Sequence, residues 1–330
     1  MNAFLLEATA TLCHSATGAA ACETPAPALL PRKGCAQGAA TGAPTMALAD
    51  DAVTLKLDGL IGFSGDVPGG LKVVRSPNLP GDREWLVYPL GSQVVVRQSG
   101  TSRGKSNLTF LTGHNDDVSC VCVSRDGRTL VTGQTAVQGV MSDVLVWDLA
   151  EACECALSGD SQGGERALKH RLRQHKSGVQ AVAINCNDTF LATLGGRDDN
   201  ALVIWDLDSG EAICGQPAAA ESGLAMAWLR ENPDRLVTCG ARHLRVWVVD
   251  VSLPKLHPMD AITGALKRIM ISVTIGTGDE FAYVGTTTGE VLKFSIDRDG
   301  IQGPNDPDRT RPRYREISRA KCSQGVTAIM

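Results

Sequence analysis

The sequence predicts an all-β fold built from several copies of one four-stranded antiparallel unit. From residue 53 onward, short runs rich in Val, Ile, Leu and Thr alternate with Gly, Asp, Asn and Pro, and almost no stretch has helical periodicity. Similar segments recur, and their equivalent end positions are 97, 147, 205, 247 and 294, which are 50, 58, 42 and 47 residues apart. That period favours one small β-sheet per repeat.

The composition excludes several classes of protein. The chain has 330 residues, 43% of them hydrophobic, and a net charge of -4, which is typical of a globular protein with ample material for a core. We expect no nucleic-acid partner, because that role normally needs a basic balance. We expect no membrane partner, because no apolar run approaches the roughly 18 residues of a membrane-spanning helix. Eleven dispersed cysteines and no secretory signal indicate free thiols in the cytosol.

Residues 1–49 differ in composition from the rest. Alanine supplies 15 of these 49 positions, and large apolar side chains are scarce, so we expect a disordered extension. Two alternatives stay open. One is an organelle transit peptide, although Arg and Ser are few. The other is that the natural chain starts at Met46.

Two repeats align directly with each other. The first runs from Gly113-His114 to Trp147-Asp148, and the second from Gln174-His175 to Trp205-Asp206. A weaker third copy ends at Trp247, and two degenerate copies flank these three. Each copy places short strand-like runs between turn residues, as a four-stranded unit requires.

The order of Gly-His, Thr, Asp and Trp-Asp resembles the WD40 family of β-propellers, in which each repeat supplies one blade. The resemblance implies a propeller over residues 50–330 that is incomplete, with about five blades and one further strand. The blades are expected at roughly 53–112, 113–174, 175–215, 216–257 and 258–319, and the next would begin at 320–330. Residues 53–57 are expected to complete a last blade that this chain does not encode.

The resemblance also implies a buried tetrad of hydrogen-bonded side chains in each blade. In the second clear copy its members are His175, Thr193, Asp199 and Trp205. A buried indole N–H needs an acceptor, and a hydroxyl, an imidazole and a carboxylate in series satisfy one another.

The other copies depart from this tetrad. The first copy has His114, Thr132 and Trp147, but Asp143 follows an insertion at 134–142 and lies only four residues before the tryptophan, so we expect an incomplete network. The third copy has Ala241 at the acidic position and no Gly-His. We expect strand pairing and apolar packing alone to hold it.

No pattern in the sequence indicates catalysis. A Thr, a His and an Asp in one repeat have the chemistry of a nucleophile, a base and an orienting acid, but they recur at blade spacing and end in a tryptophan. We therefore predict structural roles and no enzyme. A propeller hydrolase would need polar groups on the first strands 118–123 and 179–184, which offer chiefly apolar residues and thiols.

We predict no cofactor and no metal. Residues 99–106 come close to a phosphate-binding loop, but Ser99 replaces its first glycine and no helix is expected to follow. Cys120 with Cys122, and Cys153 with Cys155, are each expected on one face of a strand, where their spacing does not suit zinc. Residues 297–300 have too few ligands for a calcium loop.

Two basic clusters, at 169–176 and 309–315, fall in connections between blades. Such loops often carry binding, and these clusters are either solvated or contact an acidic partner. The candidate contacts are Lys169, Arg171, Arg173, Arg311 and Arg313.

Several segments resemble, more closely, WD-repeat proteins of motile cilia. The segments are 59–63, 67–71, 88–91, 132–148, 213–219, 266–269 and 285–290. The resemblance implies a structural protein of the axoneme, bound inside the doublet microtubule to tubulin and to other inner proteins. It also implies two tandem propellers, so we expect this chain to be a fragment of a longer protein. The alternative is a cytosolic adaptor, such as the substrate receptor of a ubiquitin ligase.

Overall fold

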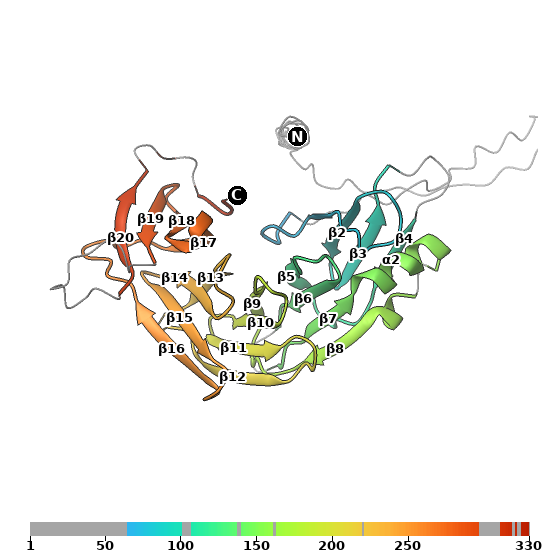
Figure 1. Cartoon of the computed structure of the whole chain (residues 1–330), viewed down its shortest axis with the longest axis horizontal. Coiled ribbons are helices and arrows are strands. Elements are labelled where there is room, and N and C mark those ends of the chain that lie inside the picture. Colours follow the sequence, from blue (N-terminus) through green and yellow to red (C-terminus); the bar gives the residue numbers. More distant parts are fainter. Residues whose placement is uncertain are drawn as a thin grey trace, which may run out of the picture. The chain divides into compact units, whose positions relative to one another are not determined.

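Five four-stranded antiparallel sheets, each made of consecutive strands, form the described part of the chain (Figure 1). The structure, a computed structural model, describes residues 65–100, 107–136, 140–160, 163–219, 221–296, 311–318, 321 and 325–329. The predicted extension 1–49 and the predicted strand 53–57 lie outside them. The sheets confirm an all-β fold of repeated antiparallel units.

We number these sheets as blades one to five. Blade one contains β1 (Lys72–Val74), β2 (Trp85–Leu90), β3 (Gln93–Gln98) and β4 (Leu108–Leu111). Blade two contains β5 (Val118–Val123), β6 (Thr129–Gln134), β7 (Val144–Asp148) and β8 (Leu168–Leu172). Blade three contains β9 (Val179–Ile184), β10 (Phe190–Gly195), β11 (Ala201–Asp206) and β12 (Ala212–Pro217). Blade four contains β13 (Gly223–Trp228), β14 (Arg235–Gly240), β15 (Leu244–Asp250) and β16 (Lys255–Asp260). Blade five contains β17 (Met270–Ile275), β18 (Phe281–Thr286), β19 (Val291–Ser295) and β20 (Arg313–Ile317).

The middle blades share one register. The tryptophan of the third strand pairs with a leucine of the second strand, as Trp147 with Leu130, Trp205 with Leu191 and Trp247 with Leu236. These tryptophans and leucines are buried. Because the register repeats, side chains with the same place in each repeat occupy the same place in each blade.

Apolar residues gather between consecutive blades. Each of four buried clusters joins the facing sides of two neighbouring sheets. The first strands β5, β9, β13 and β17 lie side by side in that order. Among the described residues the first and fifth sheets do not pack against each other, so the ring of blades is not closed (Figure 1).

One helix, α2 (Leu149–Ser158), interrupts blade two between β7 and β8. Asp148 caps it by accepting hydrogen bonds from the backbone N–H groups of Ala150 and Glu151. Gly159 ends it in the left-handed conformation, with φ of 78°. The prediction that Cys153 and Cys155 lie on a strand is therefore wrong, because ten residues with a cap at each end form a helix here.

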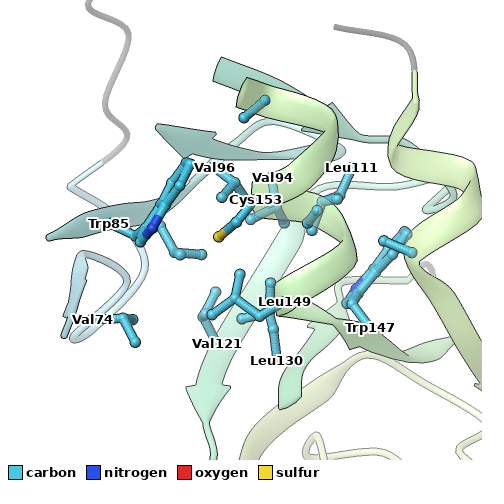
Figure 2. Close-up of a cluster of buried hydrophobic side chains, with 14 of the residues drawn as sticks. Val74, Trp85, Val94, Val96, Leu111, Val121, Leu130, Trp147, Leu149 and Cys153 are labelled. Atoms are coloured by element: carbon cyan, nitrogen blue, oxygen red, sulfur yellow. The ribbon is translucent and has the colours of Figure 1, made fainter. Parts of the chain in front are cut away.

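The buried face of α2 packs on blade one. The helix contacts β3 and β4, and Leu149 and Cys153 lie in the same cluster as Val94 and Leu111 (Figure 2). A short 3-10 helix at Gly163–Ala167 lies beside α2 and leads back to β8. The helix thus belongs by sequence to blade two and by burial to blade one.

Residues 325–329 lie against blade five. The backbone N–H of Val326 donates to the carbonyl of Thr286 at 3.0 Å, and the Ser272 hydroxyl donates to the carbonyl of Val326 at 2.7 Å. Cys120 has the register position of Ser272 in blade two, and its thiol donates to the carbonyl of Val179, on the first strand of blade three, at 3.9 Å. Val326 therefore occupies the place that the first strand of a following blade takes elsewhere, although the segment has no strand pairing of its own.

Candidate functional site

Blade three contains a complete hydrogen-bonded tetrad. The Trp205 indole N–H donates to the Thr193 hydroxyl at 2.9 Å, and that oxygen lies 2.7 Å from Nε2 of His175. Nδ1 of His175 lies 2.6 Å from the Asp199 carboxylate. Burial alone would raise the pKa of Asp199, but the hydrogen bond from His175 lowers it overall. The structure thus brings together all four predicted residues, and every polar group in the series has a partner.

Blade two replaces the carboxylate with an amide. Nε2 of His114 lies 2.7 Å from the Thr132 hydroxyl, which accepts from the Trp147 indole at 2.9 Å. Nδ1 of His114 lies 2.9 Å from the side-chain carbonyl of Gln134. The expectation of an incomplete network is therefore wrong, because Gln134, at the end of β6, supplies the fourth member.

Blade four keeps half of the network. The Trp247 indole donates to the Thr238 hydroxyl at 2.9 Å. The prediction that strand pairing and apolar packing alone hold this blade is therefore wrong. His243 places its ring beside Gly240, and its Nδ1 bonds to the carbonyl of Ala241 at 3.1 Å. Burial lowers the pKa of His243, and its Nε2 is buried without a hydrogen-bond partner among the described residues.

In blades two and three, the residue two positions after the threonine decides which group completes the network. A side-chain carbon at Gly195 would lie 2.1 Å from the Asp199 carboxylate, so glycine there makes room for the acid. At Gly240 it would lie 2.7 Å from the His243 ring. Gln134 fills the same place with its own amide. Sequence inspection missed Gln134, although its position two residues after Thr132 was a usable signal.

Carboxylates in two turns join neighbouring blades. Asp188 of blade three accepts the backbone N–H groups of Arg125 and Asp126 in blade two, at 2.8 and 2.9 Å. Asp279 of blade five has the same role toward blade four. Asp188 and Asp279 both have positive φ, at 58° and 56°, which an aspartate tolerates better than most residues.

Asp279 of blade five binds three successive amides of blade four. It accepts from Arg230 at 2.7 Å, from Glu231 at 2.9 Å and from Asn232 at 3.0 Å. Successive N–H groups of this kind form a concave anion site, and here a buried carboxylate of the same chain fills it. The sequence did not indicate these residues, because each contact joins turns that are 47 to 63 residues apart.

Two of the predicted contact residues converge on one acid. Arg171 and Arg173 both form ion pairs with Asp143, and Arg173 does so through Nε at 2.5 Å. Arg171 also donates to the carbonyl of Gly113 at 3.0 Å. Burial alone would raise the pKa of Asp143, but the hydrogen bonds from the two arginines lower it overall. Asp143 is therefore no tetrad member, and the insertion aims it at the arginines instead.

The other predicted contact residues do not pair with Asp143. Lys169 and Arg171 lie on β8 and Arg313 lies on β20, so the prediction that these clusters fall in connections is wrong for these residues. Lys169 pairs with Asp148 at 3.2 Å, and Arg311 donates to the carbonyl of Asp260 at 3.3 Å. Arg313 begins β20, where it pairs with Ser295. The five predicted contact residues thus do not share one partner.

The remaining candidate sites have no assembled chemistry in the part of the chain that the structure describes. Cys120 is buried, and burial raises its pKa to about 12, so its thiol is protonated at neutral pH. No group of three His, Cys, Asp or Glu side chains suited to a metal occurs among the described residues. Residues 101–106 and 297–300 of the loop candidates lie outside them. No described helix is long and apolar enough to cross a membrane.

Comparison with known proteins agrees with this geometry. The model of the family described as WD domain, G-beta repeat, matches residues 105–137 and 166–206. These ranges include all four tetrad residues of blade three, and His114, Thr132 and Gln134 but not Trp147 of blade two.

Similar proteins share one printed name. Cilia- and flagella-associated protein 52 of Chlamydomonas reinhardtii is 41% identical over 244 residues, which cover 74% of this chain and 36% of the relative. The Bos taurus protein of that name is 36% identical over 248 residues, with the same two shares. WD repeat-containing protein 90 of Mus musculus is 25% identical over 201 residues, 59% of this chain and 9% of the relative.

The chain spans about a third of the length of the first two of these relatives. It carries WD40 repeats, and over 74% of its length it is homologous to cilia- and flagella-associated protein 52.

Proposed function

We propose that this chain is a noncatalytic WD-repeat scaffold of motile cilia and flagella. In this role it is a microtubule inner protein that stabilises axonemal doublet microtubules by contacting tubulin and neighbouring inner proteins. The observation that carries the proposal is the homology to proteins named as cilia- and flagella-associated, at 41% and 36% identity over 74% of the chain.

The described structure supports a scaffold role. The polar side chains of blades two and three are used in tetrads that hold strands together, and the turns of neighbouring blades are joined by Asp188 and Asp279. WD40 repeats themselves point to a family of non-enzymatic scaffolds. In this proposal residues 50–330 form the propeller domain that follows the extension 1–49. The homology does not favour the cytosolic adaptor.

Fractionation of cilia tests the proposal. The tagged chain is expressed in ciliated cells, and isolated cilia are extracted first with detergent and then with salt. We expect the chain to stay with the doublet microtubules and to cross-link to tubulin. Release into the soluble fractions would reject a structural role in the axoneme.

Two further measurements sharpen this test. Protease added to intact doublets should spare the chain if it lies inside the microtubule, and cleavage without opening the doublet would reject the inner position. Leu191→Asp is the matched control, because it places a carboxylate in the core at a fully buried position. Retention of this unfolded variant would show that retention does not require the propeller.

A further inference from the structure

Two arginines share one carboxylate on the surface of blade two. Asp143 has a side-chain exposure of 3%, whereas Arg171 and Arg173 have exposures of 35% and 58%. One negative charge therefore faces two positive charges, and the excess positive charge lies on the exposed side. An exposed guanidinium keeps N–H groups that can bind a second carboxylate.

An exposed apolar pair lies next to Asp143 in the chain. Val140 and Met141 have exposures of 50% and 44%. Ser142, which follows them, is anchored to blade three: its backbone N–H donates to the carbonyl of His175 at 3.1 Å, and its hydroxyl donates to the carbonyl of Ser177. Because hydrogen bonds and ion pairs fix Ser142 and Asp143, the backbone next to the two apolar side chains is also fixed.

This combination differs from ordinary surface composition. Single exposed apolar residues are common and need no explanation. Here two adjacent ones lie two and three residues before the acid that binds both arginines, and methionine and arginine are both enriched where proteins bind each other. We call Val140, Met141, Arg171 and Arg173 the arginine–methionine surface.

We propose that the arginine–methionine surface docks an acidic polypeptide segment that carries an apolar or aromatic side chain next to its carboxylates. A carboxylate of the partner binds the guanidinium groups, and the neighbouring apolar side chain packs on Val140 and Met141. A nucleic acid fits this surface less well, because the four residues include no aromatic ring on which a base could stack. The inference rests on the proposed function only in taking the partner to be an axonemal protein.

Binding of synthetic copolymers to the full 330-residue chain tests this proposal. Fluorescence anisotropy compares a labelled copolymer of Glu and Tyr with poly-Glu, which lacks the apolar anchor, and with a copolymer of Lys and Tyr, which has the opposite charge. We expect the Glu–Tyr copolymer to bind tightest. Its affinity should fall with added salt, because the screening length shrinks from about 10 Å at 0.1 M to about 3 Å at 1 M.

Single substitutions locate the binding surface. Arg173→Gln and Met141→Ser should each weaken binding of the Glu–Tyr copolymer by roughly threefold to tenfold. Met141→Glu should weaken it further by repulsion. Arg128→Gln is the matched control, because Arg128 is also an exposed arginine of blade two but lies in the turn between β5 and β6. It should leave binding unchanged.

Each other outcome overturns the proposal or a stated part of it. Absence of binding, equal binding of the Lys–Tyr copolymer, or equal losses in Arg173→Gln and Arg128→Gln would reject the surface. Equal binding of poly-Glu would reject the apolar anchor. Arg173→Lys keeps the charge and serves if Arg173→Gln does not fold. Because the assay needs no cilium, failed ciliary retention with intact copolymer binding would reject only the proposed function.

Discussion

The side-chain carbonyl of Gln134 lies 2.9 Å from Nδ1 of His114, in the place that the Asp199 carboxylate takes beside His175 in the next blade. The amide satisfies the ring N–H but brings no negative charge to stabilise an imidazolium. Burial is therefore the dominant influence, and it lowers the pKa of His114 to about 4.

This pKa predicts a pH dependence of stability. The unfolded chain protonates His114 near its ordinary pKa of 6.5, and the folded chain does so only near 4, so the unfolded state binds more protons between these values. The free energy of unfolding should fall as the pH drops from 6.5 to 4, by roughly 3 kcal/mol from this histidine. Urea unfolding at several pH values measures the fall.

Gln134→Glu isolates the contribution of His114 from that of the carboxylates that also titrate in acid. A glutamate at this position should raise the pKa of His114 and shrink the loss of stability between pH 6.5 and 4. An NMR titration of the His114 ring follows the pKa directly. Unchanged titration of the ring in the variant would contradict the assigned role of Gln134.

Removal of the tetrad hydroxyl should cost more in blade three than in blade four. Thr193→Val leaves two buried groups, the Trp205 indole and Nε2 of His175, without their partner. Thr238→Val leaves only the Trp247 indole. At about 1–3 kcal/mol for each unsatisfied group, the first substitution should destabilise the protein about twice as much. Urea unfolding of both variants measures the loss in the free energy of unfolding, and equal losses would argue against the coupled network.

Asp279 should stabilise the contact between blades four and five through its charge and its two oxygens. Asp279→Gly tolerates the positive φ but removes all three hydrogen bonds to blade four, so we expect a loss of about 2–4 kcal/mol. Asp279→Asn keeps one acceptor oxygen and should lose less.

Hydrogen exchange at the backbone amides of Arg230, Glu231 and Asn232 checks this prediction locally. Exchange there should accelerate in both Asp279 variants. Asp188→Asn is a parallel control that should affect Arg125 and Asp126 instead. Acceleration spread evenly over all blades would indicate a general loss of stability and not a local contact.

The ion pairs of Asp143 predict an asymmetry between partners. Asp143→Ala frees two arginines that can turn toward solvent, so we expect a loss of only about 1–2 kcal/mol. The double variant Arg171→Ala with Arg173→Ala leaves a buried carboxylate uncompensated and should cost about 3–5 kcal/mol. Chemical denaturation of the two variants measures both values, and the reverse order would show that Asp143 gains solvent access.

The repeated register was predictable from the sequence, because strand runs recur every 42 to 58 residues and three of them end near a tryptophan. The structure that follows the aspartate at the end of each third strand was not predictable. Asp148 caps a helix, whereas Asp206 accepts the backbone N–H groups of Asp208 and Ser209 and Asp250 those of Ser252 and Leu253 in tight turns. In all three places the aspartate accepts backbone N–H groups two and three residues later, so the residues that follow decide whether a helix or a turn forms.

The tetrad of blade three could be proposed from residue types, since all four members follow the family pattern. Gln134 could not be assigned with the same ease, because glutamine is not the family residue and its role depends on the register of β6 against β5. Asp188 and Asp279 depend on how one blade sits beside the next. Such contacts are set by packing of the whole repeat array and leave no local pattern.

Helix α2 also determines where this protein can be divided. A cut between β4 and β5 would strip the cover from Val94 and Leu111 on one piece and expose Leu149, Ala152 and Ala156 on the other. Both pieces would have exposed apolar surfaces and should aggregate. A cut between β8 and β9 would leave the helix packed on blade one, but it would open the apolar cluster that blades two and three share. Helix α2 is thus an additional link between blades one and two, which repeat counting alone would have assigned to blade two only.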